Sequence, residues 1–446
     1  MGSIESSPPP TSLFDLSHER RAGVDTARSS RPFRQGLMTR TPLSRAVRLL
    51  QPVVLLAVLV SVLSARAGED PPENAGVNCP YCHGEPELME ASGILSHGGF
   101  RIAKSTTAEI DAKFPREPIY WVETEHFEIG MAVDDYRVHA QERDGFREEL
   151  TELMEVFDGI KPKTRTIDPW LRVHIYALRL ERGWSRFLEF ARVKNSDFPD
   201  GTRQRLFGEK YMGEGPYVGM RSKFEFLLLA RADDHVALLL EKHGLGSPRS
   251  HRVHAVDTGT LGLMTHLTEP GLRRDEALHA HFVFNLGHNM LDGYKHYSYD
   301  QPVWFKVGFA HLMGRQVSLK FNNFDGSEGS QQLQSRVEDW HGEVRKLIRK
   351  GDAPTVARLL GAKIYGELEL ADHYASWSML AYLAEVHPEG FACILDSMTG
   401  LVDDFGGIQS GALNDRLREA FQECLGLSFM DFDRAWQEWL VAPEEN

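Results

Sequence analysis

The chain has 446 residues, of which 42% are hydrophobic and 26% charged, a composition typical of a folded protein with two or three domains. Its 50 basic and 64 acidic residues give a net charge of −14; the first 67 residues hold nine arginines and four acidic residues, so the remainder carries 41 basic and 60 acidic side chains. This acidity argues against a nucleic acid partner, because nothing offers a basic footprint, and solubility is its simplest meaning.

The N-terminal part is predicted to be a leader. Residues 1–37 are rich in Ser, Pro and Arg without hydrophobic periodicity, which indicates disorder or an extension upstream of a start at Met38. Residues 38–67 have the parts of a secretory signal peptide: basic residues, the short apolar run Pro52–Leu63 and an Ala-Arg-Ala cleavage site ending at Ala67. We therefore predict export to the periplasm or cell envelope. A membrane contact is expected only if the signal segment stays uncleaved as an anchor.

Residues 68–117 form a cysteine-containing N-terminal segment with the motif CPYCH at positions 79–83. CxxCH is the attachment motif of c-type haem, in which Cys79 and Cys82 would bind the haem vinyl groups and His83 the iron. Alternatively, the two cysteines and His97, with His83 as a fourth ligand, would bind structural zinc. A disulfide between the cysteines is the third interpretation, and we favour it because the segment is short for enclosing a haem.

Residues 118–270 are predicted to form a small mixed sheet with helices packed on it. Alternating or continuous apolar runs predict strands at Ile119–Met131, Leu171–Leu178, Lys223–Ala230 and Thr258–Thr268. Apolar residues at helical spacing predict helices at Phe146–Phe157, Trp184–Val193 and His235–His243.

The segment Asp275–Leu291 is predicted to be a buried helix, because apolar side chains cover almost its whole circumference, with Gly293 as its end. One stripe of this helix is polar, and we call it the central stripe: His281, Asn285, His288 and Asp292. Buried polar groups need partners, so a metal or catalytic site would lie on this stripe.

This helix and the following segment Trp304–Ala310 resemble the gluzincin zinc metallopeptidases. In that family, HExxH on one helix supplies two zinc ligands and a general base, and a glutamate in a WLxEGxA helix is the third ligand. In the aminopeptidase-type members, 18 residues separate the second histidine from this glutamate. His288 stands at the second histidine position, and Val307 follows after the same interval. Phe284, Asn285 and Val307 replace the first histidine, the base and the third ligand.

The resemblance implies a peptidase-like fold whose active site is dismantled. Catalytic zinc needs about three protein ligands and an open position for water. Phenylalanine and valine offer no lone pair, and asparagine cannot accept a proton at neutral pH, so we expect no catalytic zinc. The leading hypothesis is a pseudo-metallopeptidase with a binding or structural role in the cell envelope. Its partner would be an unidentified protein or peptide.

Two alternative functions stay open. One is a c-type haem protein for electron transfer, based on the CPYCH motif. The other is a metal-dependent hydrolase with rearranged ligands, for which His288 and His311 on the two helices would bind the metal. The loop between these helices carries Tyr294, His296 and Tyr297, which would line a cleft if one persists; a plain surface loop is the other interpretation.

Residues 271–444 are predicted to be mostly helical after the helix pair, with Pro388 dividing the segment Tyr374–Ser397 into two helices. We expect Cys393 and Cys424 to pack in the core as thiols. The predicted fold class is therefore α+β: a small mixed β-sheet with helices, then a gluzincin-like helix pair and a mostly helical C-terminal part.

Overall fold

The computed structural model of the protein describes residues 79–200, 210–255, 257–296, 301–324, 337–401 and 413–442. The chain divides into two units, Met1–Gly68 and Glu69–Asn446, and all described residues belong to the second. The predicted extension and signal peptide lie outside the described residues.

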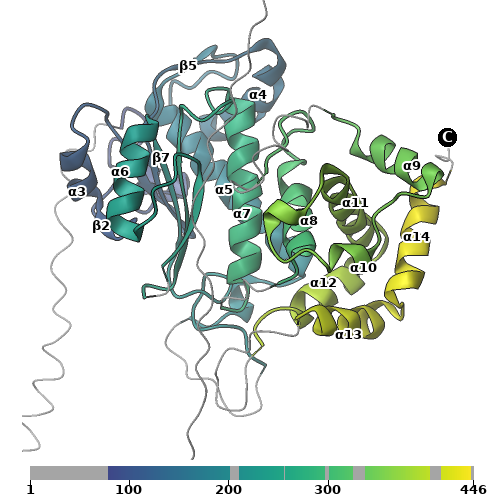
Figure 1. The fold of residues 1–446 in the computed structure, drawn as a ribbon. Helices are drawn as coiled ribbons and strands as arrows, with labels where there is room; N and C mark the ends of the chain where they lie inside the picture. Colours follow the sequence, from purple (N-terminus) through teal and green to yellow (C-terminus); the bar gives the residue numbers. More distant parts are fainter. Residues whose placement is uncertain are drawn as a thin grey trace, which may run out of the picture. The chain divides into compact units, whose positions relative to one another are not determined.

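The predicted α+β fold is confirmed. A five-stranded sheet has the strand order β3-β4-β7-β9-β8 (Figure 1). The three inner strands are parallel to one another, and each edge strand is antiparallel to its neighbour. The bounds are β3 Tyr120–Glu123, β4 Phe127–Met131, β7 Phe224–Leu229, β8 His251–Ala255 and β9 Thr260–His266. The sheet is thus mixed, as predicted.

Both faces of the sheet are covered, which explains why its central strands are so apolar. In β7, Phe226 and Leu228 belong to the core shared with α5 (Pro169–Ala191) and α7 (Asp275–Gly293). Leu227 and Leu229, which alternate with them, belong to the core shared with α6 (Ala232–His243). Figure 1 shows α6 on one side of β7 and α5 and α7 on the other.

The prediction of a strand at Leu171–Leu178 is wrong. This run is the first half of α5, and the helix predicted at Trp184–Val193 is largely its second half. Asp168 caps the helix by accepting a hydrogen bond from the Leu171 amide at 3.1 Å, and Pro169 occupies the first turn. The eight-residue apolar run reads equally as a strand or a buried helix, and here the cap and the length of the whole segment decide for a helix.

The predicted strand Ile119–Met131 is a hairpin of β3 and β4. The chain turns at Thr124, whose hydroxyl oxygen accepts a hydrogen bond from the Phe127 amide at 3.1 Å. Smaller elements precede and flank this hairpin: α2 Pro86–Ala91, β1 Arg101–Ile102, β2 Ser105–Thr106, α3 Thr107–Lys113, β5 Tyr136–Arg137, α4 Arg143–Met154 and β6 Thr166–Ile167.

The central helix pair forms as predicted, with α7 packed on α8 (Val303–Gly314) and α8 packed on α11 (Leu370–Val386). The second contact needs a glycine: a Cβ atom at Gly308 would lie 2.7 Å from the Ser376 carbonyl oxygen. The other C-terminal helices are α9 Trp340–Lys350, α10 Val356–Leu359, α12 Pro388–Ser397, α13 Leu413–Leu425 and α14 Phe429–Val441. As predicted, Pro388 begins a new helix.

Cys393 and Cys424 form a disulfide, so the prediction of two core thiols is wrong. The cysteines lie 31 positions apart in the sequence, but α12 packs on α13 and brings their Cα atoms to 5.7 Å, within the range that a disulfide spans. None of the described helices is long and apolar enough to cross a membrane.

Candidate functional site

The central stripe of α7 is buried along its whole length, as predicted. The positions that resemble the zinc site hold apolar packing instead. The Phe284 ring lies between two imidazoles, with centroid distances of 4.9 Å to His288 and 5.1 Å to His311. Val307 is buried in the core from the α8 side. A phenyl ring and an isopropyl group therefore occupy the places of two ligands.

Asn285, at the position of the general base, connects α7 to β8. Its side-chain oxygen accepts a hydrogen bond from Arg252 Nη1 at 3.1 Å. Its amide nitrogen donates to the His281 carbonyl oxygen at 2.8 Å. This side chain is therefore a bridging hydrogen-bond group rather than a base that could activate water.

His288 has no exposed surface, and neither ring nitrogen has a hydrogen-bond partner among the described residues. Buried polar groups usually have a partner, so this imidazole is an exception among the described residues. Its ring meets the Tyr365 ring edge-on at 5.7 Å, and Tyr365 belongs to the 3-10 turn Tyr365–Glu367 of the helical part. Burial lowers the pKa of His288 well below its usual value, and the charges of Arg252 and Lys306 act in the same direction. The imidazole is neutral.

His311 does not join His288 in a metal site. Its Nε2 atom lies 3.1 Å from His373 Nδ1, and its ring packs on Trp340. Phe284 lies against both His288 and His311. Among the described residues, the candidate metal-binding group contains neither histidine. The hydrolase with rearranged ligands therefore lacks support in this geometry.

A buried ion pair connects α8 to α7 at the end of the central stripe. Lys306 Nζ lies 2.7 Å from an Asp292 carboxylate oxygen. Burial alone would lower the pKa of Lys306, but Asp292 and the Tyr365 hydroxyl outweigh it and raise this pKa above its ordinary value. The lysine is charged and positioned beside His288 and Tyr365.

The predicted cleft loop is only partly described. Tyr294 is fully buried and packs edge-on against Phe187 and Phe198, so it belongs to the core and does not line a cleft. His296 lies near the surface, with Nδ1 3.0 Å from the Tyr211 hydroxyl. Tyr297 lies outside the described residues.

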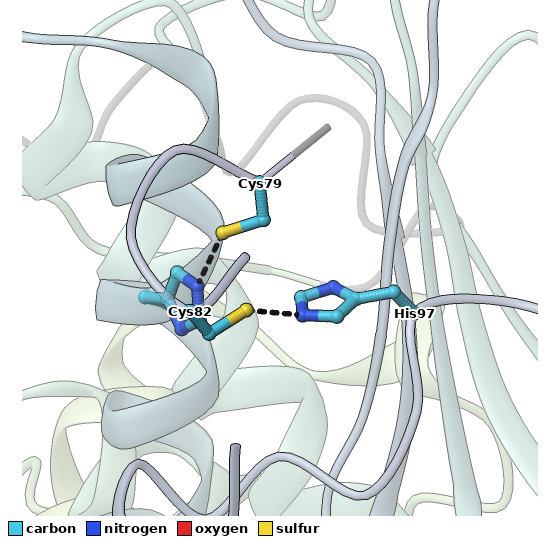
Figure 2. Close-up of side chains that lie close together, drawn as sticks. Cys79, Cys82 and His97 are labelled. Carbon is cyan, nitrogen blue, oxygen red and sulfur yellow. Dashed lines mark hydrogen bonds between the residues drawn. The ribbon is translucent and has the colours of Figure 1, made fainter. Parts of the chain in front are cut away.

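A second polar cluster lies at the start of the described chain, and we call it the Cys/His cluster: Cys79, Cys82, His97 and His174. Both cysteines are free thiols, so the predicted disulfide between them is wrong. Cys79 Sγ lies 3.3 Å from His174 Nε2, and Cys82 Sγ lies 2.9 Å from His97 Nε2. Figure 2 shows the two sulfurs pointing inward, toward the imidazoles.

Three separate segments build this cluster. The cysteines lie on a turn closed by a hydrogen bond from the His83 amide to the Cys79 carbonyl oxygen at 3.1 Å. The Tyr81 hydroxyl donates to Asp168, the cap of α5, and so fixes the turn on that helix. His174 projects from the second turn of α5. His97 follows a bridge between Ser96 and Glu123 that ties its loop to β3.

Haem does not fit this arrangement. His83, the expected axial ligand, is exposed, has a left-handed backbone with φ 53°, and is not part of the cluster. The two thiols are 1% and 0% exposed and contact imidazole nitrogens directly, which leaves no space for a porphyrin between the groups. The haem interpretation is therefore not favoured, and the cluster contains His174 in place of His83, the residue expected as the fourth of a zinc site.

No local sequence pattern indicates a role for His174. It lies 92 positions beyond Cys82 and inside the run that was predicted to be a strand. As part of a helix, His174 is buried in the second turn of α5, whose cap Asp168 accepts a hydrogen bond from Tyr81 of the CPYCH motif.

Comparisons with known proteins identify no relative of this chain. No protein-family model matches it, and no curated protein or solved structure is significantly similar. The resemblance to gluzincins stays a hypothesis based on the spacing of Phe284, His288 and Val307.

Proposed function

We propose that this protein is a non-catalytic, peptidase-like binding protein of the cell envelope, and that its central stripe binds an anionic group of a peptide or protein ligand. The observation that carries the proposal is His288: a fully buried imidazole with two nitrogens that lack hydrogen-bond partners among the described residues. Leaving a buried polar group unpaired costs about 1 to 3 kcal/mol, so a ligand that pairs with it would recover that free energy.

The charges around His288 favour an anion. The charges of Arg252 and Lys306 both act on this imidazole, and Lys306 also pairs with Asp292. Both cations also approach the Tyr365 ring, at 5.7 and 6.0 Å from its centroid. Two cationic side chains thus lie near a neutral histidine, a setting suited to a carboxylate.

Catalysis is disfavoured by the same residues. Phe284 fills the place of one ligand, Asn285 is held by Arg252, and Val307 offers no donor atom. The Cys393–Cys424 disulfide supports the proposed export, because disulfides persist mainly in oxidising compartments.

The proposal is tested with paired peptide pools that differ only in a free or amidated C-terminal carboxylate. We expect the free-acid pool to bind at least tenfold more tightly, and His288→Ala and Arg252→Gln to remove this preference. His83→Ala, a substitution of an exposed histidine, is the matched control and should bind like the original protein. Equal binding of both pools, or hydrolysis of either pool that is lost in His288→Ala, would contradict the proposal.

A further inference from the structure

We propose that Cys79, Cys82, His97 and His174 bind one structural Zn²⁺ ion. This inference is independent of the function proposed above, since no residue is shared between the Cys/His cluster and the central stripe.

The geometry of the cluster suits a single tetrahedral ion. All four ligand atoms lie within 4.8 Å of one another. With Zn–S near 2.3 Å and Zn–N near 2.0 to 2.1 Å, a tetrahedral site separates its ligand atoms by roughly 3.3 to 3.8 Å. The two shortest sulfur–nitrogen distances, 2.9 Å for Cys82 to His97 and 3.3 Å for Cys79 to His174, need only a small expansion to admit the ion.

The ligand types select zinc. Two thiolates and two imidazoles in a tetrahedral arrangement are a common set for structural zinc. A two-iron cluster with mixed ligands would place both sulfurs on one iron and both imidazoles on the other. Here each sulfur lies against an imidazole, so the four atoms surround one centre.

One hydrogen bond to a residue outside the cluster orients His97 for binding a metal ion. His97 Nδ1 lies 3.2 Å from the Trp121 carbonyl oxygen on β3, to which it donates a hydrogen bond when its Nε2 atom binds zinc. That bond fixes both the tautomer and the orientation of the ring. The cluster also contains four protein ligands and is buried, so it keeps no open position for substrate.

Binding balances in charge. The ion displaces one proton from each thiol, and two thiolates neutralise Zn²⁺ with two neutral imidazoles beside it. The buried site then carries no net charge, which removes the large penalty of an isolated buried ion.

The ion would stabilise a part of the chain that has little hydrophobic core of its own. Among the described residues between Cys79 and His97, the only helix is the six-residue α2, which buries a single residue, Met89. Zinc would join the turn at Cys79 and Cys82 to the loop at His97, which follows 15 positions after Cys82, and to α5 at His174, 95 positions beyond Cys79. Small segments with little core depend on such a metal or a disulfide.

The first test measures metal in the protein purified after expression of the full chain. We expect about one zinc per chain by elemental analysis, lost in Cys82→Ser and in His174→Ala but retained in His83→Ala and His288→Ala. Substitution with Co²⁺ should produce the strong visible absorption of tetrahedral thiolate coordination. Zinc retained in the cluster variants but lost in His288→Ala would overturn the inference.

A second measurement needs no variant and therefore does not depend on whether a variant folds. A strong chelator added to the original protein should release one zinc as two thiols become reactive, and the melting temperature should fall by several degrees. Added zinc should restore both properties. Protein that contains iron, a covalent chromophore, a Cys79–Cys82 disulfide, or two reactive thiols without zinc would contradict the proposal.

Discussion

The Cys/His cluster and the central stripe both bring imidazoles into the interior, and they differ in what faces those imidazoles. In the cluster, the Nε2 atom of each imidazole lies 2.9 or 3.3 Å from a thiol sulfur. On the stripe, His288 meets the rings of Phe284 and Tyr365 instead. The stripe resembles the spacing of a metal site but has lost two of its three ligands and the general base, whereas the cluster brings four donor residues together although His174 has no local sequence signal. Donor geometry is therefore the better guide to metal.

The first prediction concerns a substitution that removes one ligand from the Cys/His cluster. Cys82→Ser should lower the free energy of unfolding by several kcal/mol, because structural zinc sites in small peptides contribute on the order of 10 kcal/mol. Denaturant unfolding with and without added zinc measures this effect. The original protein should respond to zinc and the variant should not; an equal response of both would contradict the assignment.

The second prediction concerns the ion network that connects α5, which carries His174, to α7, which carries the stripe. Arg179 donates to Glu149 and Asp275 at 2.6 to 2.9 Å, and all three side chains are buried. Arg179→Ala should lower the free energy of unfolding by about 3 to 5 kcal/mol, because it leaves buried carboxylates unpaired. Urea unfolding measures the loss.

A neighbouring arginine supplies the control for that prediction. Arg182 pairs with Glu152 on the same side of α5, but both side chains are nearly half exposed. Arg182→Ala should change the free energy of unfolding by less than about 1 kcal/mol. Equal losses in the two variants would show that the network does not join the two regions energetically.

The third prediction sharpens the contrast at His288. His288→Leu should raise the free energy of unfolding by about 1 kcal/mol, because it removes a buried group whose nitrogens have no partners among the described residues. The same variant should lose binding of free-acid peptides. Calorimetry and peptide titration test both effects, and a loss of stability would indicate that His288 is paired in solution.

The fourth prediction is that Asn285→Glu changes neither the zinc content nor the peptide hydrolysis of the protein. Asn285→Glu restores the sequence of the general base, but Phe284 and Val307 still provide no ligand. We expect no additional zinc and no chelator-sensitive peptide hydrolysis in this variant. Any such hydrolysis would mean that the stripe still holds an ion.

The sequence was sufficient to predict the elements with strong periodicity. The buried helix α7, the helix around Trp304 and the strand β7 follow from apolar patterns that allow one structure each. The apolar pattern of the run Leu171–Leu178 is compatible with both a strand and a helix. Because a strand was predicted there, His174 was not included in the zinc interpretation. The contacts of His174 with Cys79, and of Cys393 with Cys424, depend on how helices pack across long intervals, which no local pattern encodes.

The most direct test compares zinc content in two single variants of the full chain. We expect about one zinc per chain in the original protein and in His288→Ala, and none above background in Cys82→Ser. Zinc that persists in Cys82→Ser and disappears in His288→Ala would place the metal on the central stripe and contradict the proposed zinc site.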